Sequence, residues 1–206
     1  MTSVCTSQMP AGAKARFIHI CRTGPICILA CCLASFAYAQ LSPTAPALLN
    51  SNATTDSGAD RSSQVATDGQ GHWVAVWQSE EDLGGVAGTD ADIFVARSAN
   101  NGASWTAPAT LNSNASTDSG DDFDPAIATD SMGNWVVAWR SDENLGGVAG
   151  TDDDLFVARS TDDGATWTPP AFLNSEAATG SENDGSPGLT TGGLGQWVDV
   201  WGAHVG

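Results

Sequence analysis

The chain repeats itself with a fixed period of 62 residues, and this repeat limits the folds it can adopt. The segment Leu49–Asn52 returns as Leu111–Asn114 and, in part, as Leu173–Ser175. The pair Trp73 and Trp77 returns at 135 and 139 and at 197 and 201, without an insertion between the copies. A period of this size indicates one supersecondary unit copied in tandem. We therefore divide this part of the chain into two complete repeats and one truncated repeat, 49–110, 111–172 and 173–206.

Each repeat contains four short apolar runs separated by Gly, Asp, Asn and Ser, which is typical of strands joined by turns. In the second copy, the runs predict strands at 125–129, 135–140, 154–160 and 166–173. In the strand at 135–140, apolar residues point to both faces, so both faces should be covered. A four-stranded sheet that copies of itself cover on both faces is a β-propeller blade. The sequence thus predicts an all-β fold and an incomplete β-propeller.

The two ends of the repeat region predict partial blades. The segment 44–47 aligns with the start of the fourth strand of the later copies, whereas the last copy stops after a second strand. We therefore expect two full four-stranded blades with a partial blade at each end. A closed ring needs roughly four to eight blades, so the repeats indicate either a truncated product of a longer protein or copies that assemble. Unpaired strand edges also predict self-association through the open edges of the sheets.

The first 39 residues have the pattern of a secretory signal. Basic residues precede an apolar run at 26–37, and Ala37-Tyr38-Ala39 has the small-x-small form of a cleavage site. We therefore assign 1–39 to a signal peptide and 40–206 to the repeats, and we expect a secreted, periplasmic or cell-exterior protein. All five cysteines lie in the leader, so the repeats have no thiol with which to form a disulfide.

The charge of the repeats excludes several classes of partner. All 24 acidic residues lie after the leader, together with only four arginines and no lysine. So acidic a surface repels phosphate backbones and anionic lipid. We therefore expect no nucleic-acid partner and no membrane association after cleavage of the signal.

Two short segments in register suggest the family of the repeat. Ser160–Trp167 has the form S-x-D-x-G-x-T-W, and Ser98–Trp105 matches it with Asn for Asp and Ser for Thr. These segments resemble Asp boxes, the bacterial neuraminidase repeats of sialidases and several other propeller families. The resemblance implies turns on the outside of the propeller, where the box residues are structural. Those residues are Ser98, Asn100, Gly102, Ser104 and Trp105, and Ser160, Asp162, Gly164, Thr166 and Trp167.

The resemblance first implies an exo-α-sialidase, which would use a tyrosine nucleophile, an acidic acid/base and three arginines. The only tyrosine, Tyr38, lies in the leader, so we assign no catalytic residue. Our interpretation is a secreted non-catalytic propeller fragment that binds glycans or an extracellular protein. The alternative is a sialidase-like glycoside hydrolase whose catalytic blades are missing from this chain. Arg61 and Arg140 have no arginine at the same position in the neighbouring copies, which makes them either ligand-binding residues or simple surface cations.

Several aspartates bunch in glycine-rich loops and suggest a metal site. Calcium takes six to eight oxygens from flexible loops of this kind. The loops lack the terminal glutamate of an EF-hand, and a solvated acidic loop is the alternative. We predict no cofactor, and the alternative is a calcium ion with these candidate ligands: Asp118, Asp122, Asp124, Asp152 and Asp154.

Overall fold

The computed structural model describes residues 48–56, 58–150, 152–193 and 195–202. The predicted signal peptide and the strand expected at 44–47 lie outside these residues. The described residues contain strands and turns but no helix. Accordingly, none of the described residues belongs to a helix of sufficient length and apolarity to cross a membrane.

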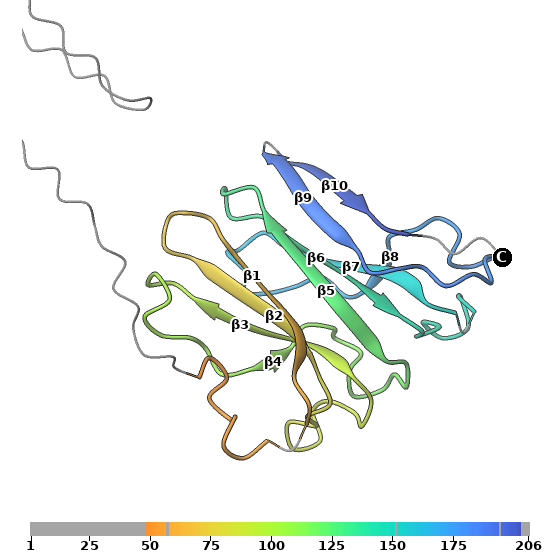
Figure 1. The fold of residues 1–206 in the computed structure, drawn as a ribbon, viewed down its shortest axis with the longest axis horizontal. Helices are drawn as coiled ribbons and strands as arrows, with labels where there is room; N and C mark the ends of the chain where they lie inside the picture. Colours follow the sequence, from red (N-terminus) through yellow and green to blue (C-terminus); the bar gives the residue numbers. More distant parts are fainter. Residues whose placement is uncertain (1–47, 57, 151, 194, 203–206) are drawn as a thin grey trace, which may run out of the picture. The chain divides into compact units, whose positions relative to one another are not determined.

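The strands form successive antiparallel sheets in chain order (Figure 1). Blade 1 contains β1 (Arg61–Thr67), β2 (Trp73–Ser79), β3 (Asp92–Ser98) and β4 (Ala109–Thr110). Blade 2 contains β5 (Asp122–Thr129), β6 (Trp135–Ser141), β7 (Asp154–Ser160) and β8 (Ala171–Phe172). Blade 3 is represented by β9 (Gly188–Gly193) and β10 (Gln196–Val200). The described fold is therefore an incomplete β-propeller with two full blades and part of a third.

The fourth strand of blade 2 is shorter than the sequence predicted. β8 covers two residues, although the apolar pattern predicted a strand over 166–173. Pro169 and Pro170 have no backbone N–H, so they cannot donate to the ladder with β7. The backbone still follows β7 on both sides of the prolines, since Thr168 N donates to Arg159 O at 2.9 Å and Leu173 N to Leu155 O at 2.7 Å.

The main core lies between blades 1 and 2. All five residues of β6 from 135 to 139 are at most 4% exposed, so both faces of this strand are covered as its pattern predicted. Trp135 and Trp139 pack in one cluster with Val74, Val76 and Ile93 of blade 1. A Cβ at Gly164, whose φ is +76°, would lie 2.7 Å from Val74 Cγ2, so the turn after β7 also approaches blade 1 closely. Blade 2 is thus stacked on blade 1 through large apolar side chains.

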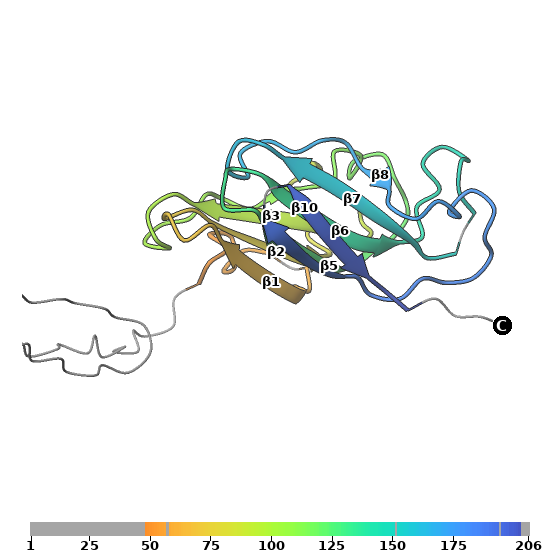
Figure 2. The same cartoon turned by 90° about the horizontal axis from the view of Figure 1, so that it is seen from above.

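The first strands of the three blades lie next to one another. β1 contacts β5 and β5 contacts β9, although no hydrogen-bonded ladder joins these strands. Figure 2 shows β1 and β5 on one side of the described sheets and β7 and β8 on the opposite side. In both β1 and β5 the register shifts near the beginning of the strand, between Arg61 and Gln64 and between Phe123 and Ala126. These bulges re-aim the side chains at the position where the three first strands begin.

Candidate functional site

A row of hydrogen-bonded side chains joins the beginnings of the three first strands. Ser62, Asp124 and Ser186 occupy the same position of successive repeats, and we call these three residues the polar row. Ser62 Oγ donates to Asp124 Oδ1 at 2.8 Å, and Ser186 Oγ donates to Asp124 Oδ2 at 2.8 Å. Ser62 and Asp124 have positive φ values of 52° and 48°, because they form the bulges. One carboxylate therefore ties three blades together.

The environment of Asp124 favours its charged form. Burial alone would raise the pKa of this carboxyl, but the hydrogen bonds from Ser186 and Ser62 and the charge of Arg140 outweigh burial and lower it. A groove of about 440 Å³ lies alongside, and its lining includes all three residues of the polar row. Asp124 is thus an ionised acceptor at the edge of an open groove.

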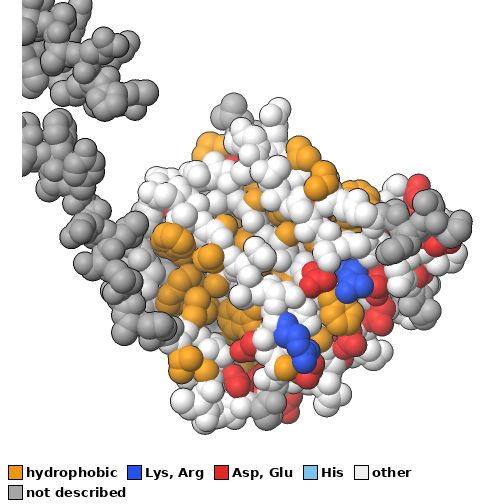
Figure 3. Space-filling view, in the orientation of Figure 1, with side chains coloured by type: hydrophobic (Ala, Val, Ile, Leu, Met, Phe, Trp, Pro, Cys, Tyr) orange, Lys and Arg blue, Asp and Glu red, His pale blue; other side chains and the backbone are white. Residues whose placement is uncertain are grey.

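Arg61 and Arg140 both lie at this end of the strands, but carboxylates already engage them. Arg61 Nη1 lies 2.6 Å from Glu80 Oε1, in a pair whose side chains are 56% and 46% exposed. Arg140 Nη1 lies 2.6 Å from Asp153 Oδ2, and Arg140 Nη2 lies 3.5 Å from Asp124 Oδ2. Figure 3 shows basic side chains with acidic neighbours over the beginnings of the first strands. Arg140 therefore contacts the polar row through Asp124, whereas Arg61 forms a separate ion pair.

The two segments that resemble Asp boxes form the turns after β3 and β7. Asp162 Oδ1 accepts from Thr166 N at 2.9 Å and from Ser160 Oγ at 2.8 Å, and Oδ2 accepts from Thr166 Oγ1 at 2.7 Å. Hydrogen bonds from Thr166 and Ser160 lower the pKa of Asp162 to about 2. Asn100 makes the equivalent bonds to Ser98 and Ser104 in blade 1.

These turns lie away from the polar row. In an antiparallel meander, the turn after a third strand lies at the opposite end from the beginning of the first strand. Gly102 and Gly164 have φ values of +78° and +76°, which suits a tight turn. Trp167 packs against the core between blades 1 and 2, and Trp105 packs against the cluster on the other face of blade 1.

The structure divides the predicted calcium ligands among several places. Asp118 lies with Asp90 and Asp92, and we call these three residues the acid cluster. Asp122 is fully buried nearby, where burial raises its pKa well above the usual range and a hydrogen bond to Ser141 acts in the opposite direction. Asp124 belongs instead to the polar row.

Asp152 and Asp154 belong to the next copy of the same loop. There Asn174 Nδ2 donates to Asp154 Oδ1 at 3.0 Å and to Asp184 Oδ2 at 2.7 Å. Asp90 and Asp92 were not among the predicted ligands. A signal was present, because these two residues are the repeat equivalents of Asp152 and Asp154.

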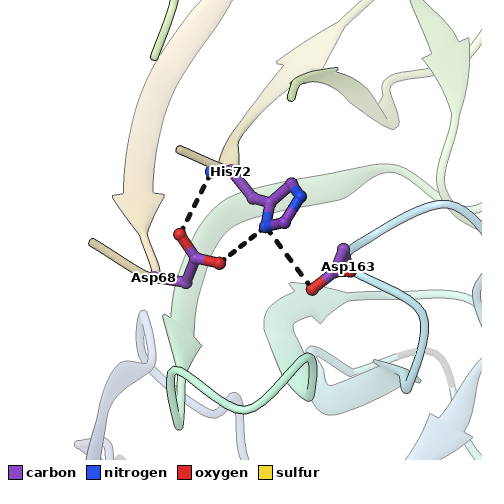
Figure 4. A group of neighbouring side chains, drawn as sticks. All are labelled: Asp68, His72 and Asp163. Atoms are coloured by element: carbon purple, nitrogen blue, oxygen red, sulfur yellow. Dashed lines mark hydrogen bonds and ion pairs between the residues drawn. The ribbon is translucent and has the colours of Figure 1, made fainter. Parts of the chain in front are cut away.

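A third polar group lies between the turn after β1 and the turn after β7 (Figure 4). His72 Nδ1 lies 2.7 Å from Asp68 Oδ2 and 3.7 Å from Asp163 Oδ1. The hydrogen bond to Asp68 raises the pKa of His72, burial and Arg97 oppose this, and the charges of Asp163 and Asp68 add to it. In blade 2, Asn134 takes the place of His72 and donates Nδ2 to Asp130 Oδ2 at 2.7 Å. Because an asparagine amide makes the equivalent hydrogen bond in blade 2, we interpret His72 as a residue that stabilises the turn rather than as a metal ligand.

Comparison with known proteins gives similarities at the level of structure. No protein-family model and no curated protein sequence matches the chain. A Hadza microbial sialidase is 22% identical, with 56% of this chain and 26% of the sialidase chain covered and a TM-score of 0.44. An α-L-arabinanase from Penicillium chrysogenum is 16% identical over 65% of this chain and 36% of the other, with a TM-score of 0.42. An endo-arabinase from Bacteroides thetaiotaomicron is 16% identical over 69% and 50%, with a TM-score of 0.43.

The chain spans no more than half the length of these three proteins. A similarity of this size gives no information on catalysis, since one fold carries many activities.

Proposed function

We propose that this protein is a secreted, non-catalytic propeller module that binds glycans through the polar row. The observation that supports this function is the connection of Ser62, Asp124 and Ser186 across three blades at the edge of an open groove. Hydroxyls and an ionised carboxylate in fixed positions offer the donors and acceptors that sugar hydroxyl groups need. Binding sites of this kind combine a concave surface with a few convergent polar groups.

The carboxylates near the groove do not suit glycoside hydrolysis. A glycosidase of the common type needs one carboxyl group with a raised pKa as a general acid and a second as a base or nucleophile. The pKa of Asp124 is lowered, and both Asp124 and Asp153 are engaged by Arg140. The tyrosine that a sialidase would use is also missing from residues 40–206. These features favour binding over turnover.

The charges favour a neutral glycan over a sialylated one. Recognition of a sugar carboxylate needs arginines whose donors converge on one point and remain available. Arg61 is already paired with Glu80, and Arg140 with Asp153 and Asp124. An acidic sugar would have to displace these partners and would also meet a chain of net charge −17.

The function is tested by measuring binding and turnover on the same preparation. We expect neutral oligosaccharides on a glycan array to bind, and fluorogenic sialosides and arabinosides to remain uncleaved. Asp124→Ala should weaken the binding of the best glycan at least tenfold, because it removes the acceptor that joins the polar row. Asp162→Asn is the matched control, since the first copy already carries Asn100 at that position. Cleavage of a glycoside by the purified protein would support the glycosidase alternative. Binding that survives both Asp124→Ala and Arg140→Ala would refute the site.

A further inference from the structure

The acid cluster brings three carboxylates from two separate segments of the sequence together at the junction of blades 1 and 2. Asp90 lies on the loop before β3, Asp92 begins β3, and Asp118 lies on the connection from β4 to β5. One oxygen from each of the three lies within 4.8 Å of the others. Two oxygens on opposite sides of one calcium ion are roughly 5 Å apart, twice the Ca–O distance of about 2.4 Å. The spacing therefore allows one ion to contact all three carboxylates.

Each carboxylate of the acid cluster has one buried oxygen without a hydrogen-bond partner. Asp92 is 0% exposed, and its Oδ2 has no donor. Asp90 Oδ2 and Asp118 Oδ1 are likewise buried atoms without a partner, and so is Asn114 Oδ1 on the same connection as Asp118. Buried oxygen atoms are normally hydrogen-bonded, because leaving one unsatisfied costs roughly 1–3 kcal/mol and more when it is charged. Three neighbouring carboxylates that each carry such an acceptor require a cation or protons.

No side-chain cation supplies the missing charge. None of the ion pairs formed by the described residues includes Asp90, Asp92 or Asp118. Charged carboxylates whose oxygens lie within 4.8 Å of one another repel, so the cluster is an unfavourable arrangement without a positive partner.

The surrounding residues hold the carboxylates in the orientation that a metal site needs. Asn112 is fully buried; its Oδ1 accepts from Ile93 N at 3.2 Å, and its Nδ2 donates to Asp92 Oδ1 at 2.7 Å. Asn114 Nδ2 donates to Asp118 Oδ2. In both aspartates one oxygen is fixed by an amide, and the other has no hydrogen-bond partner. Hydrogen bonds of this kind orient the ligands of metal sites in proteins.

Gly88 gives the loop its close approach. A Cβ at this position would lie 2.3 Å from Asp90 Oδ1 and 3.2 Å from the carbonyl oxygen of Ala115, so a side chain would push the loop away from the connection to β5. Glycine therefore allows the Asp90 carboxylate and a backbone carbonyl to lie on the same side of the loop. Carbonyl oxygens commonly complete the coordination of calcium.

We propose that the acid cluster binds a calcium ion, which fixes the connection from blade 1 to the first strand of blade 2. The donors are all oxygens, without the sulfur or imidazole that zinc prefers. Two of them lie on loops and one at the first residue of β3, and such a flexible set suits calcium better than the strict octahedron of magnesium. The proposal goes beyond the binding of glycans, because the cluster does not share a residue with the polar row. The acid cluster lies where the chain passes from blade 1 to blade 2, so a bound ion there would stabilise the contact between the blades rather than bind a ligand.

The next copy of the loop keeps part of this arrangement. Asp152 Oδ2, Asp154 Oδ2 and Asn174 Oδ1 are again buried atoms without a partner. The positions of Asn114 and Asp118 are taken by Glu176, which is exposed, and by Gly180. The number of carboxylates is the same in both copies, but one of them now lies on an exposed side chain. We expect a second, weaker site here.

The experiment titrates the purified protein with calcium by isothermal calorimetry and with terbium by luminescence. Terbium should be sensitised through Trp139, whose influence on the pKa of Asp122 places it near the acid cluster. We expect calcium to compete with terbium and to raise the melting temperature by several degrees. Asp92→Asn should weaken the tighter site at least tenfold and remove most of the rise in melting temperature. Asp162→Asn, a change of the same charge at an exposed turn, should leave both unchanged.

A second measurement separates loss of the metal from loss of the fold. In calcium-free buffer, Asp92→Asn should melt at the same temperature as the parent protein or higher, because it removes a buried charge without a partner. Absence of both heat and thermal shift for the parent protein at millimolar calcium would overturn the proposal. Equal calcium affinity of Asp92→Asn and the parent would overturn it as well. If Asp92→Asn does not fold, Asp118→Asn at a partly exposed position decides between these outcomes in the same way.

Discussion

The stacking of blade 2 on blade 1 predicts that equivalent tryptophans in the two blades differ in their contribution to stability. Trp135 is 0% exposed between the blades, whereas Trp73, at the same position of the previous copy, lines an open groove with Leu49 and Trp105. Trp135→Ala should lose the transfer free energy of the ring and also leave a cavity, at a cost of about 3–5 kcal/mol. Trp73→Ala only enlarges a groove that is already open, so the transfer term alone remains, about 2–3 kcal/mol.

Both variants are compared with the parent protein by urea unfolding, followed by far-ultraviolet circular dichroism because the fluorescence of one tryptophan is lost. A cost of 3–5 kcal/mol corresponds to a fall of roughly 6 to 20 °C in the melting temperature of a domain of this size. Trp135→Phe is an informative control: Trp135 Nε1 has no hydrogen-bond partner, so this change relieves an unsatisfied donor while it removes part of the ring. Equal losses for Trp135→Ala and Trp73→Ala would refute the argument that stacking between blades sets the difference.

Two further predictions concern the turns. Gly164→Ala should lower the free energy of unfolding by about 2–3 kcal/mol, because it combines a positive φ with a contact of 2.7 Å across the blades. Gly102→Ala, at φ +78° with no atom within 4 Å of the added Cβ, should lower it by only about 1 kcal/mol. Equal melting temperatures of the two variants would contradict the contact. The raised pKa of His72 predicts that its bond to Asp68 stabilises the fold fully below the ordinary pKa of 6.5 and that this contribution is lost as the pH rises through the raised pKa. NMR titration of the ring measures that pKa, and His72→Asn should flatten the dependence of stability on pH above 6.5; an unchanged profile would exclude the pair as its source.

The repeat and the alternation of apolar residues predicted most of the fold. The strand expected at 154–160 matches β7 at both ends, and the strand expected at 135–140 differs from β6 by one residue. This accuracy has a physical reason. A strand that is buried on both faces must be apolar throughout, so its ends coincide with the change to turn residues. The fourth strand of blade 2 was predicted too long, because the apolar pattern does not report how many N–H groups two prolines remove from a ladder.

The candidate sites were harder to predict, because they depend on where the chain crosses between sheets. Asp118 and Asp124 are six residues apart, and the sequence grouped them as ligands of one metal. In the structure the strand β5 begins between them, and its bulge turns Asp124 toward the first strands of the neighbouring blades. Asp90 and Asp92 reach Asp118 only because the hairpin of β3 and β4 returns the chain to the same end of the blade. Spacing along the chain therefore could not separate the two groups of carboxylates.

Differences between the copies mark the polar row more clearly than any motif does. The positions that stack the blades are the same in successive repeats, as at Trp77 and Trp139, because each blade must offer its neighbour the same surface. The position of the polar row changes from Ser62 to Asp124 to Ser186, and only this order places an acceptor between two hydroxyl donors. Three aspartates there would repel one another, and three serines would leave Arg140 without the partner it has at 3.5 Å. The alternation is therefore a feature of the assembled blades rather than of any one repeat, and it is at such positions that binding residues are best sought in an array of this kind.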